Sequence, residues 1–421
     1  MPMPLLITGL TQLLTLDGPR EARWGKDALD LGLVENGAVL IDGEKIAEAG
    51  TEKKVLKNPL CRKARRLKVT GVALPSFVDS HTHAVFAEPR LADFSLRTSG
   101  FSYQEIKEKG GGIISSVKAA RGASPEKLLS NLLDFSRRFL ENGTGTVEVK
   151  SGYGLDLKSE IKLLETIKKA AGKTPLEMLP TFLGAHAIPP EFGTSRDYLD
   201  YLVKKVLPEV ARKKLAVFAD VFCEKGYFGA KESLYYLAEC KRAGLTPKIH
   251  AEQMGKSGGS AAAASIGAIS ADHVDYADRE YLRLLKKSGT IATLLPASNY
   301  FLGLSFFPDY RKFVEEGVPV CLATDFNPGT SPCLNMQFVI SAAATHMRMK
   351  IEEAITASTI NGACALGIQA RTGMLQRGMQ ADISVFDVKD YREVAYYFGS
   401  NLNKLTIKKG KTVYEKKDSS F

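Results

Sequence analysis

The sequence contains no run of about 18 apolar residues, the length a membrane-spanning helix needs, so we expect no membrane partner. The opening stretch, MPMPLLITGLTQLLTLDGP, has neither the basic region nor the small-residue cleavage site of a secretory signal. It is more typical of paired strands than of a targeting segment.

Cysteine is scarce, and no two cysteines form a C-x-x-C pair. This pattern argues against a disulfide framework and favours a reduced, cytoplasmic compartment. The six residues are Cys61, Cys223, Cys240, Cys321, Cys333 and Cys364.

The chain has 57 basic and 47 acidic side chains, a net charge of +10. Basic residues gather in residues 61–68 (CRKARRLK) and 204–214 (KKVLPEVARKK) and near the C-terminus. No nucleic-acid-binding motif accompanies them, and aromatic residues are not interleaved as stacking platforms. We therefore interpret the charge as a solvated surface and expect no nucleic-acid partner.

The pattern of apolar and polar residues changes near residue 73 and again near residue 376. Residues 1–72 and 376–421 show β patterns, including a hairpin signal, Asp-Gly, at 42–43. Residues 73–375 alternate short apolar strands with amphipathic helical stretches, in roughly eight units. The pattern predicts an α/β fold, a (β/α)₈ TIM-like barrel over 73–375 with a small β-sandwich domain built from both termini.

Histidine is scarce too, and its placement is uneven. Only His346 of the six histidines lies inside a helical stretch. The other five follow short apolar runs, where a parallel barrel places its active-site residues. These five are His81 and His83 in PSFVDSHTH, His186 in LPTFLGAH, His250 in TPKIH and His273 in AISADH, and Asp325 ends VPVCLATD in the same way.

His81 and His83 are two residues apart, so on a strand they share one face. A lone H-x-H pair is more often two polar residues at a strand end than a ligand pair. With His250 and Asp325 at later strand ends, the set predicts one metal ion with an open position for water.

Several stretches resemble the amidohydrolase superfamily and, more closely, the imidazolonepropionase family. They are HTHAVFAEPR (81–90), SYQEIKEKGGGI (102–113), VEVKSGYGLDLKSE (147–160), TFLGAHAIPPEF (181–192), KIHAEQ (248–253), SADHVDY (270–276) and ATDFNPGTSP (323–332). The resemblance implies hydrolysis of the cyclic amide C–N bond of 4-imidazolone-5-propanoate to N-formimidoyl-L-glutamate, a step of histidine degradation. It also implies a homodimer.

The resemblance assigns roles residue by residue. It implies one Zn²⁺ or Fe³⁺ per subunit on His81, His83, His250 and Asp325, with Asp325 and His273 as catalytic residues. Some relatives carry Glu at the position of Gln253, and an amide cannot act as a base. The implied substrate contacts are Arg90, Tyr153, His186, Gln253, Asn327, Gly329 and Thr330.

In the expected reaction, Asp325 accepts a proton from water and His273 stabilises the oxyanion. Arg90 offers a planar fork to the propionate carboxylate, and Tyr153 and His186 donate hydrogen bonds to substrate oxygens.

Other interpretations stay open. Within the superfamily, the chain could be a deaminase or another cyclic-amide hydrolase, and a carbamylated Lys150 could bridge two metals. Outside it, the chain could be a metal-binding barrel without catalysis or a nucleic-acid binder. Glu148 and His346 are interpreted as structural, and the glycine-rich segment 107–113 as either a mobile flap or a surface turn.

Overall fold

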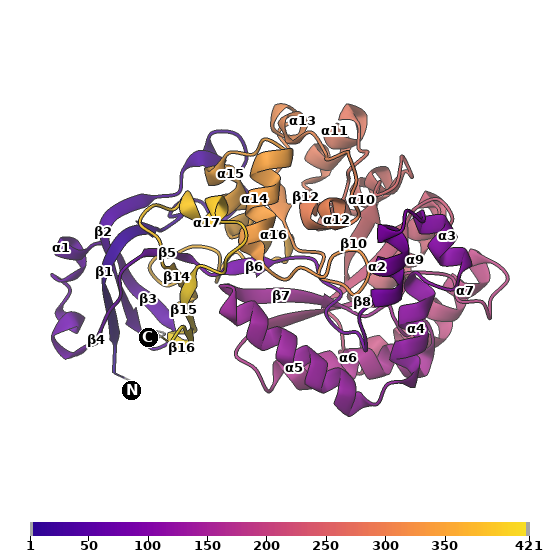
Figure 1. Ribbon diagram of the computed structural model, residues 1–421, viewed down its shortest axis with the longest axis horizontal. Coiled ribbons are helices and arrows are strands. Elements are labelled where there is room, and N and C mark those ends of the chain that lie inside the picture. Colours follow the sequence, from indigo (N-terminus) through magenta and orange to yellow (C-terminus); the bar gives the residue numbers. More distant parts are fainter. Residues whose placement is uncertain (1–2, 418–421) are drawn as a thin grey trace.

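A computed structural model describes residues 3–417 and contains two eight-stranded sheets. Figure 1 shows the terminal sheet at one end of the molecule and the barrel with its helices at the other. Among the described residues, the six cysteines are unpaired. None of the helices in residues 3–417 combines the length and the apolarity of a membrane span.

The larger unit is the expected barrel, and its eight strands are parallel and follow one another in chain order. Asp325 N donates to His81 O at 3.0 Å and His83 N donates to Phe326 O at 2.9 Å, so the first and last strands also meet. The strands are β6 (Phe77–Asp79), β7 (Thr144–Lys150), β8 (Glu177–Ala185), β9 (Phe218–Cys223), β10 (Thr246–Ala251), β11 (Ser270–His273), β12 (Ile291–Leu294) and β13 (Val320–Leu322).

Helices surround the barrel strands, and the amphipathic ones, such as those at 125–141 and 157–171, bury an apolar face against them. Two of their starts are capped by side chains: Ser124 Oγ accepts from Lys127 N at the start of α5, and Asp156 accepts from Ser159 N at the start of α6. The helices of this unit are α2 (Leu91–Thr98), α3 (Tyr103–Glu108), α4 (Ile113–Gly122), α5 (Pro125–Glu141), α6 (Leu157–Ala171), α7 (Ser195–Tyr201), α8 (Leu207–Arg212), α9 (Ala230–Arg242), α10 (Gly259–Ile266), α11 (Arg279–Ser288), α12 (Pro296–Phe301), α13 (Tyr310–Glu315), α14 (Met336–His346), α15 (Ile351–Ala357) and α16 (Ile360–Ala365).

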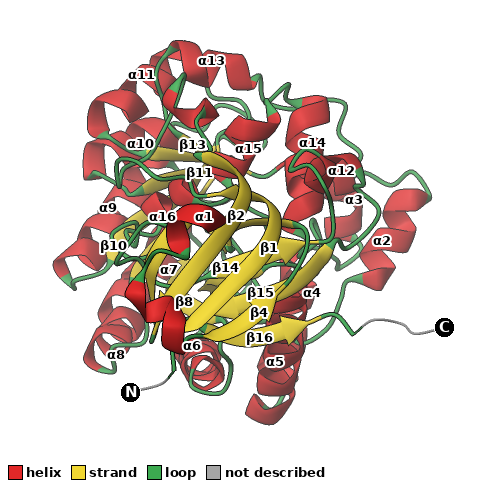
Figure 2. Ribbon diagram, turned by 90° about the vertical axis from the view of Figure 1, so that its left-hand side faces the viewer, coloured by secondary structure: helices red, strands yellow, loops and turns green. Residues whose placement is uncertain are grey.

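The second sheet is mixed and draws strands from both termini, as expected (Figure 2). They form one continuous sheet in the order β16-β15-β14-β5-β1-β2-β3, and β4 also pairs with β1. The elements are β1 (Leu5–Leu14), β2 (Leu33–Asp42), β3 (Lys45–Thr51), α1 (Glu52–Val55), β4 (Arg65–Lys68), β5 (Val72–Pro75), β14 (Ile383–Phe386), α17 (Glu393–Tyr396), β15 (Asn403–Lys408) and β16 (Lys411–Glu415).

The two units are joined at Ser76, the single residue between β5 and β6. Its hydroxyl lies 2.9 Å from that of Ser384 in β14. Lys408 of β15 reaches into the barrel base, with Nζ 3.1 Å from Glu177 of β8. The domain bounds 1–72, 73–375 and 376–421 stay predictions, and β5 extends the terminal sheet to Pro75.

Candidate metal centre and cavity

The strand-end histidines and Asp325 meet at one end of the barrel. His81 and His83 follow β6, His250 lies in β10, His273 ends β11 and Asp325 follows β13. All five are buried. This is the carboxyl end of the strands, where parallel barrels carry their active sites.

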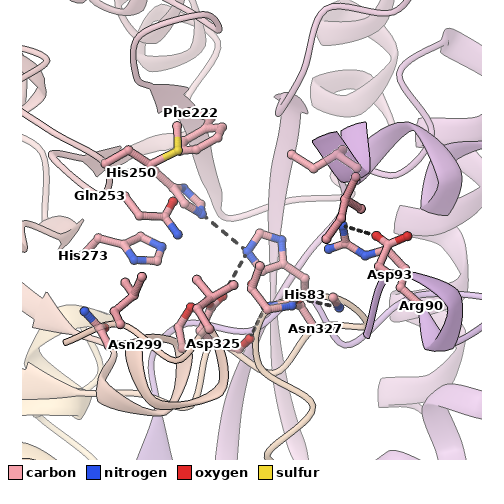
Figure 3. A pocket seen from close by; sticks show the side chains of 18 of the residues that line it. His83, Arg90, Asp93, Phe222, His250, Gln253, His273, Asn299, Asp325 and Asn327 are labelled. Atoms are coloured by element: carbon pink, nitrogen blue, oxygen red, sulfur yellow. Dashed lines mark hydrogen bonds and ion pairs between the residues drawn. The ribbon is translucent and has the colours of Figure 1, made fainter. Parts of the chain in front are cut away.

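The ring and carboxylate atoms of these residues face one another. His81 Nε2 and His83 Nε2 each lie 3.5 Å from Asp325 Oδ1. His250 Nε2 lies 3.4 Å from His83 Nε2 (Figure 3). One set (His81, His83, His250) and an overlapping one (His81, His273, Asp325) each keep their ligand atoms within 4.8 Å of one another.

The carboxylates of Asp272 and Asp220 each hold one imidazole of the site, His81 and His250 respectively, in a defined tautomer. His81 Nδ1 lies 2.6 Å from Asp272 Oδ2, and His250 Nδ1 lies 3.0 Å from Asp220 Oδ2. A carboxylate facing Nδ1 keeps the proton there and leaves Nε2 as a bare lone pair. His81 Nε2 is buried and has no hydrogen-bond partner within residues 3–417. Imidazole lone pairs that converge beside the carboxyl group of Asp325 form a donor set that fits a cation.

Burial sets the charge of these groups. It lowers the pKa values of His81, His83 and His273 well below the ordinary range, so the imidazoles are neutral, the form that binds metal. Burial also raises the pKa of Asp325 to about 7, although His250 opposes it. A bound cation would favour the ionised carboxylate.

Two residues of the site, His273 and Asp325, have unusual backbone conformations. His273 has φ of 73° and Asp325 has φ of 53°, in the left-handed region that side chains rarely adopt. Such conformations persist where the surrounding structure holds them and are common at functional sites.

Beneath the site lies a network of buried ions, of which the sequence analysis named Lys150 and Glu148 but not Asp220, Asp272 or Lys248. Lys150 Nζ lies 2.8 Å from both Glu148 Oε1 and Asp220 Oδ2, and 3.6 Å from Asp272 Oδ2. Lys248 Nζ lies 3.5 Å from Asp272 Oδ2. The available signal was an ionisable residue inside a strand that should be apolar, as Asp220 is within FADVFC.

This network bears on the two-metal alternative. Burial alone would lower the pKa of Lys150, but Asp220 and Glu148 outweigh it and raise the pKa above the ordinary value. Carbamylation needs a neutral amine, so the ammonium form in this network favours a single-metal site.

A cavity of about 380 Å³ opens above the metal centre. His81 is buried and does not line it, whereas every other predicted site residue does. Those residues are His83, Arg90, Tyr153, His186, His250, Gln253, His273, Asp325, Asn327, Gly329 and Thr330. His346 ends α14, is exposed, and stacks on Phe307 with ring centroids 4.3 Å apart, outside the cavity.

The loop after Asp325 is held by Asn327. Its amide nitrogen donates to Asp325 O at 2.7 Å, and its Oδ1 accepts from Gly329 N at 2.8 Å and Thr330 N at 2.7 Å. The loop also accepts from the backbone of Arg90, whose N–H donates to Pro328 O at 3.0 Å. The implied substrate residues on both sides of the barrel closure are therefore directly connected.

His186 faces the cavity in a form that differs from the expectation. Its Nδ1 lies 2.9 Å from Gly152 O, and because a carbonyl only accepts, Nδ1 carries the proton. Burial lowers the pKa of His186 to about 3, so the ring is neutral. Nε2 is thus an acceptor, suited to a ring N–H of a ligand and not to a carbonyl or carboxylate oxygen.

Segment 107–113 runs along the rim of the cavity. Gly112 N donates to Asp93 Oδ2 at 2.9 Å, which ties the glycines to α2. Ile106, just before the segment, and Ile113, its last residue, both line the cavity. The segment is a border of the site, which fits either a flap or a turn.

The comparisons with known proteins agree with this geometry. Residues 72–413 match the model of the amidohydrolase family. In fold, the chain is similar to guanine deaminase from E. coli, with a TM-score of 0.73, 16% identity, and 99% of this chain and 100% of that chain covered. The fold and the site together define this chain as a member of the amidohydrolase family.

Sequence relatives narrow the assignment. The chain is 41% identical over 415 residues to imidazolonepropionase from Geobacillus kaustophilus, covering 97% of this chain and 98% of that protein. It is 41% identical over 420 residues to imidazolonepropionase from Bdellovibrio bacteriovorus, covering 98% of this chain and 97% of that protein. Within the amidohydrolases, the chain belongs to the imidazolonepropionase family.

Proposed function

We propose that this chain hydrolyses the cyclic amide C–N bond of 4-imidazolone-5-propanoate and releases N-formimidoyl-L-glutamate. The observation that carries the proposal is that the residues matching the family's site border one cavity above one His/Asp cluster. The 41% identity to imidazolonepropionases over nearly the whole chain supports the same substrate.

The proposed cofactor is one Zn²⁺ or Fe³⁺ per subunit, held by His81, His83, His250 and Asp325. When bound, such an ion acts as a Lewis acid and makes water ionisable near pH ~7. Asp272 orients His81 and Asp220 orients His250, so that Nε2 of each ring is free to bind the ion, which supports this ligand set.

Two residues of the chain manage protons and charge. The Asp325 carboxylate takes the proton of the attacking water and returns it to the ring nitrogen as the C–N bond breaks. His273 borders the cavity within ligand-atom reach of Asp325, and it stabilises the oxygen on which negative charge develops. Gln253 takes no proton, because it is an amide.

The residues that bind the substrate line the part of the cavity away from Asp325 and His273. Arg90 takes the propionate carboxylate as a planar fork, and neutral His186 accepts a ring N–H at Nε2. Tyr153 is buried with its ring centroid 5.4 Å from that of His186, and it contributes to the same wall. Asn327, Gly329 and Thr330 close the site through their loop.

The testing experiment is ring opening of 4-imidazolone-5-propanoate by purified protein whose metal is quantified. We expect turnover that is lost on chelation and restored by Zn²⁺ or Fe²⁺/Fe³⁺. Guanine, adenosine and hydantoin serve as comparison substrates, and turnover of these alone would refute the proposal. Light scattering after gel filtration tests the homodimer, and fractionation of source cells tests the cytoplasmic location.

A further inference from the structure

Arg97 is a second arginine at the cavity, two helical turns after Arg90 on α2. Its Nη2 donates to Gly329 O at 3.1 Å, in the same loop that contacts Arg90. Its guanidinium carbon lies 4.8 Å from the ring centroid of Phe301 and 5.9 Å from that of Phe94. These two rings stack on each other, so the guanidinium is held in one place.

The rest of that guanidinium has nothing to bind. Arg97 Nε and Nη1 are buried, and neither has a hydrogen-bond partner in the described part of the chain. Nor does any described carboxylate lie within ion-pair distance of Arg97. Buried charged donors without acceptors are costly, so two such nitrogens in a residue that lines the cavity indicate a missing acceptor.

The local charge points the same way. Asp93 is the carboxylate between the two arginines, but its Oδ2 lies 3.6 Å from Arg90 Nη1 and already accepts from Gly112 N. Burial lowers the pKa of Arg97 and the nearby Arg90 lowers it further, while Asp93 only partly opposes them. Two guanidiniums and one carboxylate leave one positive charge, which a single anionic group balances.

We infer that Arg97 and Arg90 together form a carboxylate subsite on either side of Gly329. This inference deepens the proposed function, which names the carboxylate as the propionate of the substrate. Figure 3 shows Arg90 and Asp93 on the other side of His83 from His273, so a tail bound there leaves the ring at the metal centre. Arg97 is thus a specificity-determining residue that selects ligands with an anionic tail.

The probe is 3-(imidazol-4-yl)propanoate, with its methyl ester as the uncharged counterpart, titrated calorimetrically into the metal-loaded protein. Arg97→Met keeps the apolar stem over Phe301 and removes the charge. We expect the acid to bind about 10- to 100-fold more weakly to this variant, with ester binding within about twofold of the unsubstituted protein. Arg283→Met removes an exposed arginine that pairs with Glu316, and it should change neither affinity.

Thermal unfolding and metal content of each variant establish that it is folded. Should Arg97→Met fail to fold, Arg97→Gln keeps a donor for Gly329 O and carries the same expectation. Equal acid affinity in variant and unsubstituted protein, or equal losses for acid and ester, would overturn the inference. Absence of ring opening by the unsubstituted protein would refute the proposed function instead, while acid-selective loss in the calorimetric assay would still support the subsite.

Discussion

The guanidinium of Arg90 occupies the space that a side chain at Gly329 would fill. A Cβ atom built on Gly329 would lie 1.7 Å from Arg90 Nη2 and 1.8 Å from its Cζ, far inside van der Waals contact. The backbone of Gly329 is not in the left-handed region, so glycine is required here for close approach and not for its φ angle.

Gly329→Ala therefore tests the position of Arg90. We expect the guanidinium to be displaced, with KM for the substrate raised about 10-fold or more and metal content unchanged. Steady-state kinetics and metal analysis measure the two effects. Gly399→Ala is the matched control, since a Cβ there meets nothing within 4 Å. An unchanged KM in the Gly329 variant would separate Arg90 from substrate binding.

Arg90→Lys keeps the charge but loses the planar fork. We expect apparent substrate affinity to fall by about 10-fold or more while metal content stays at the level of the unsubstituted protein. Parallel measurement of KM and bound metal decides the matter. Loss of metal in this variant would contradict the assignment of Arg90 to the substrate alone.

His273→Ala separates catalysis from metal binding. The four proposed ligands remain, so metal should stay bound, while turnover falls by roughly 10²-fold or more through loss of oxyanion or acid–base assistance. The measurements are kcat and metal stoichiometry. Near-normal turnover would remove His273 from the mechanism.

Asp220→Asn addresses the residue behind His250. The substitution removes the carboxylate 3.0 Å from Nδ1, so His250 becomes a weaker ligand and metal affinity should fall about 10- to 100-fold. Competition with a chromophoric chelator reports this without an activity assay. The control is Asp200→Asn on α7, where the carboxylate pairs with exposed Lys204. Equal affinities would show that Asp220 serves the core network alone.

Glu177 makes stability depend on pH far from the metal. Burial opposes its ionisation, but Lys408 and Arg371 outweigh it and lower the pKa of Glu177 in the folded state. A carboxyl with a lowered folded pKa stabilises the protein above its unfolded pKa, and this contribution is lost as pH falls.

Glu177→Gln should therefore reduce the free energy of unfolding by about 1.5–3 kcal/mol at pH ~7, with a smaller reduction below pH ~4. Urea unfolding at both pH values measures the difference. Glu165→Gln, in an exposed pair with Lys213, should cost under about 1 kcal/mol at either pH. A loss independent of pH would show that the role of Glu177 is not ionic.

The barrel and the cluster of His81, His83, His250 and Asp325 were predictable because strand period and chain order place strand ends at one edge. Short motifs such as TPKIH and AISADH were informative because a polar residue that ends an apolar strand is more often part of a site than of the core.

Features that depend on contacts between distant segments were not predictable. The acceptor role of His186 depends on Gly152 O, 34 residues earlier, and no local pattern reveals it. Asp220 and Lys248 lie in short apolar strands, and their partners, Lys150 and Asp272, come from other strands that only the closed barrel brings together. Arg97 lies in an amphipathic stretch that does not show which side meets the cavity.

The terminal sheet has a consequence for synthesis. Strand β5 pairs with β1 on one side and β14 on the other, so its second edge is covered only by one of the last segments translated. The nascent chain therefore carries an open apolar strand edge while the whole barrel leaves the ribosome, a state in which it can pair with other chains. Premature termination before residue 383 would leave that edge permanently exposed, and we expect such fragments to aggregate even where the barrel has folded.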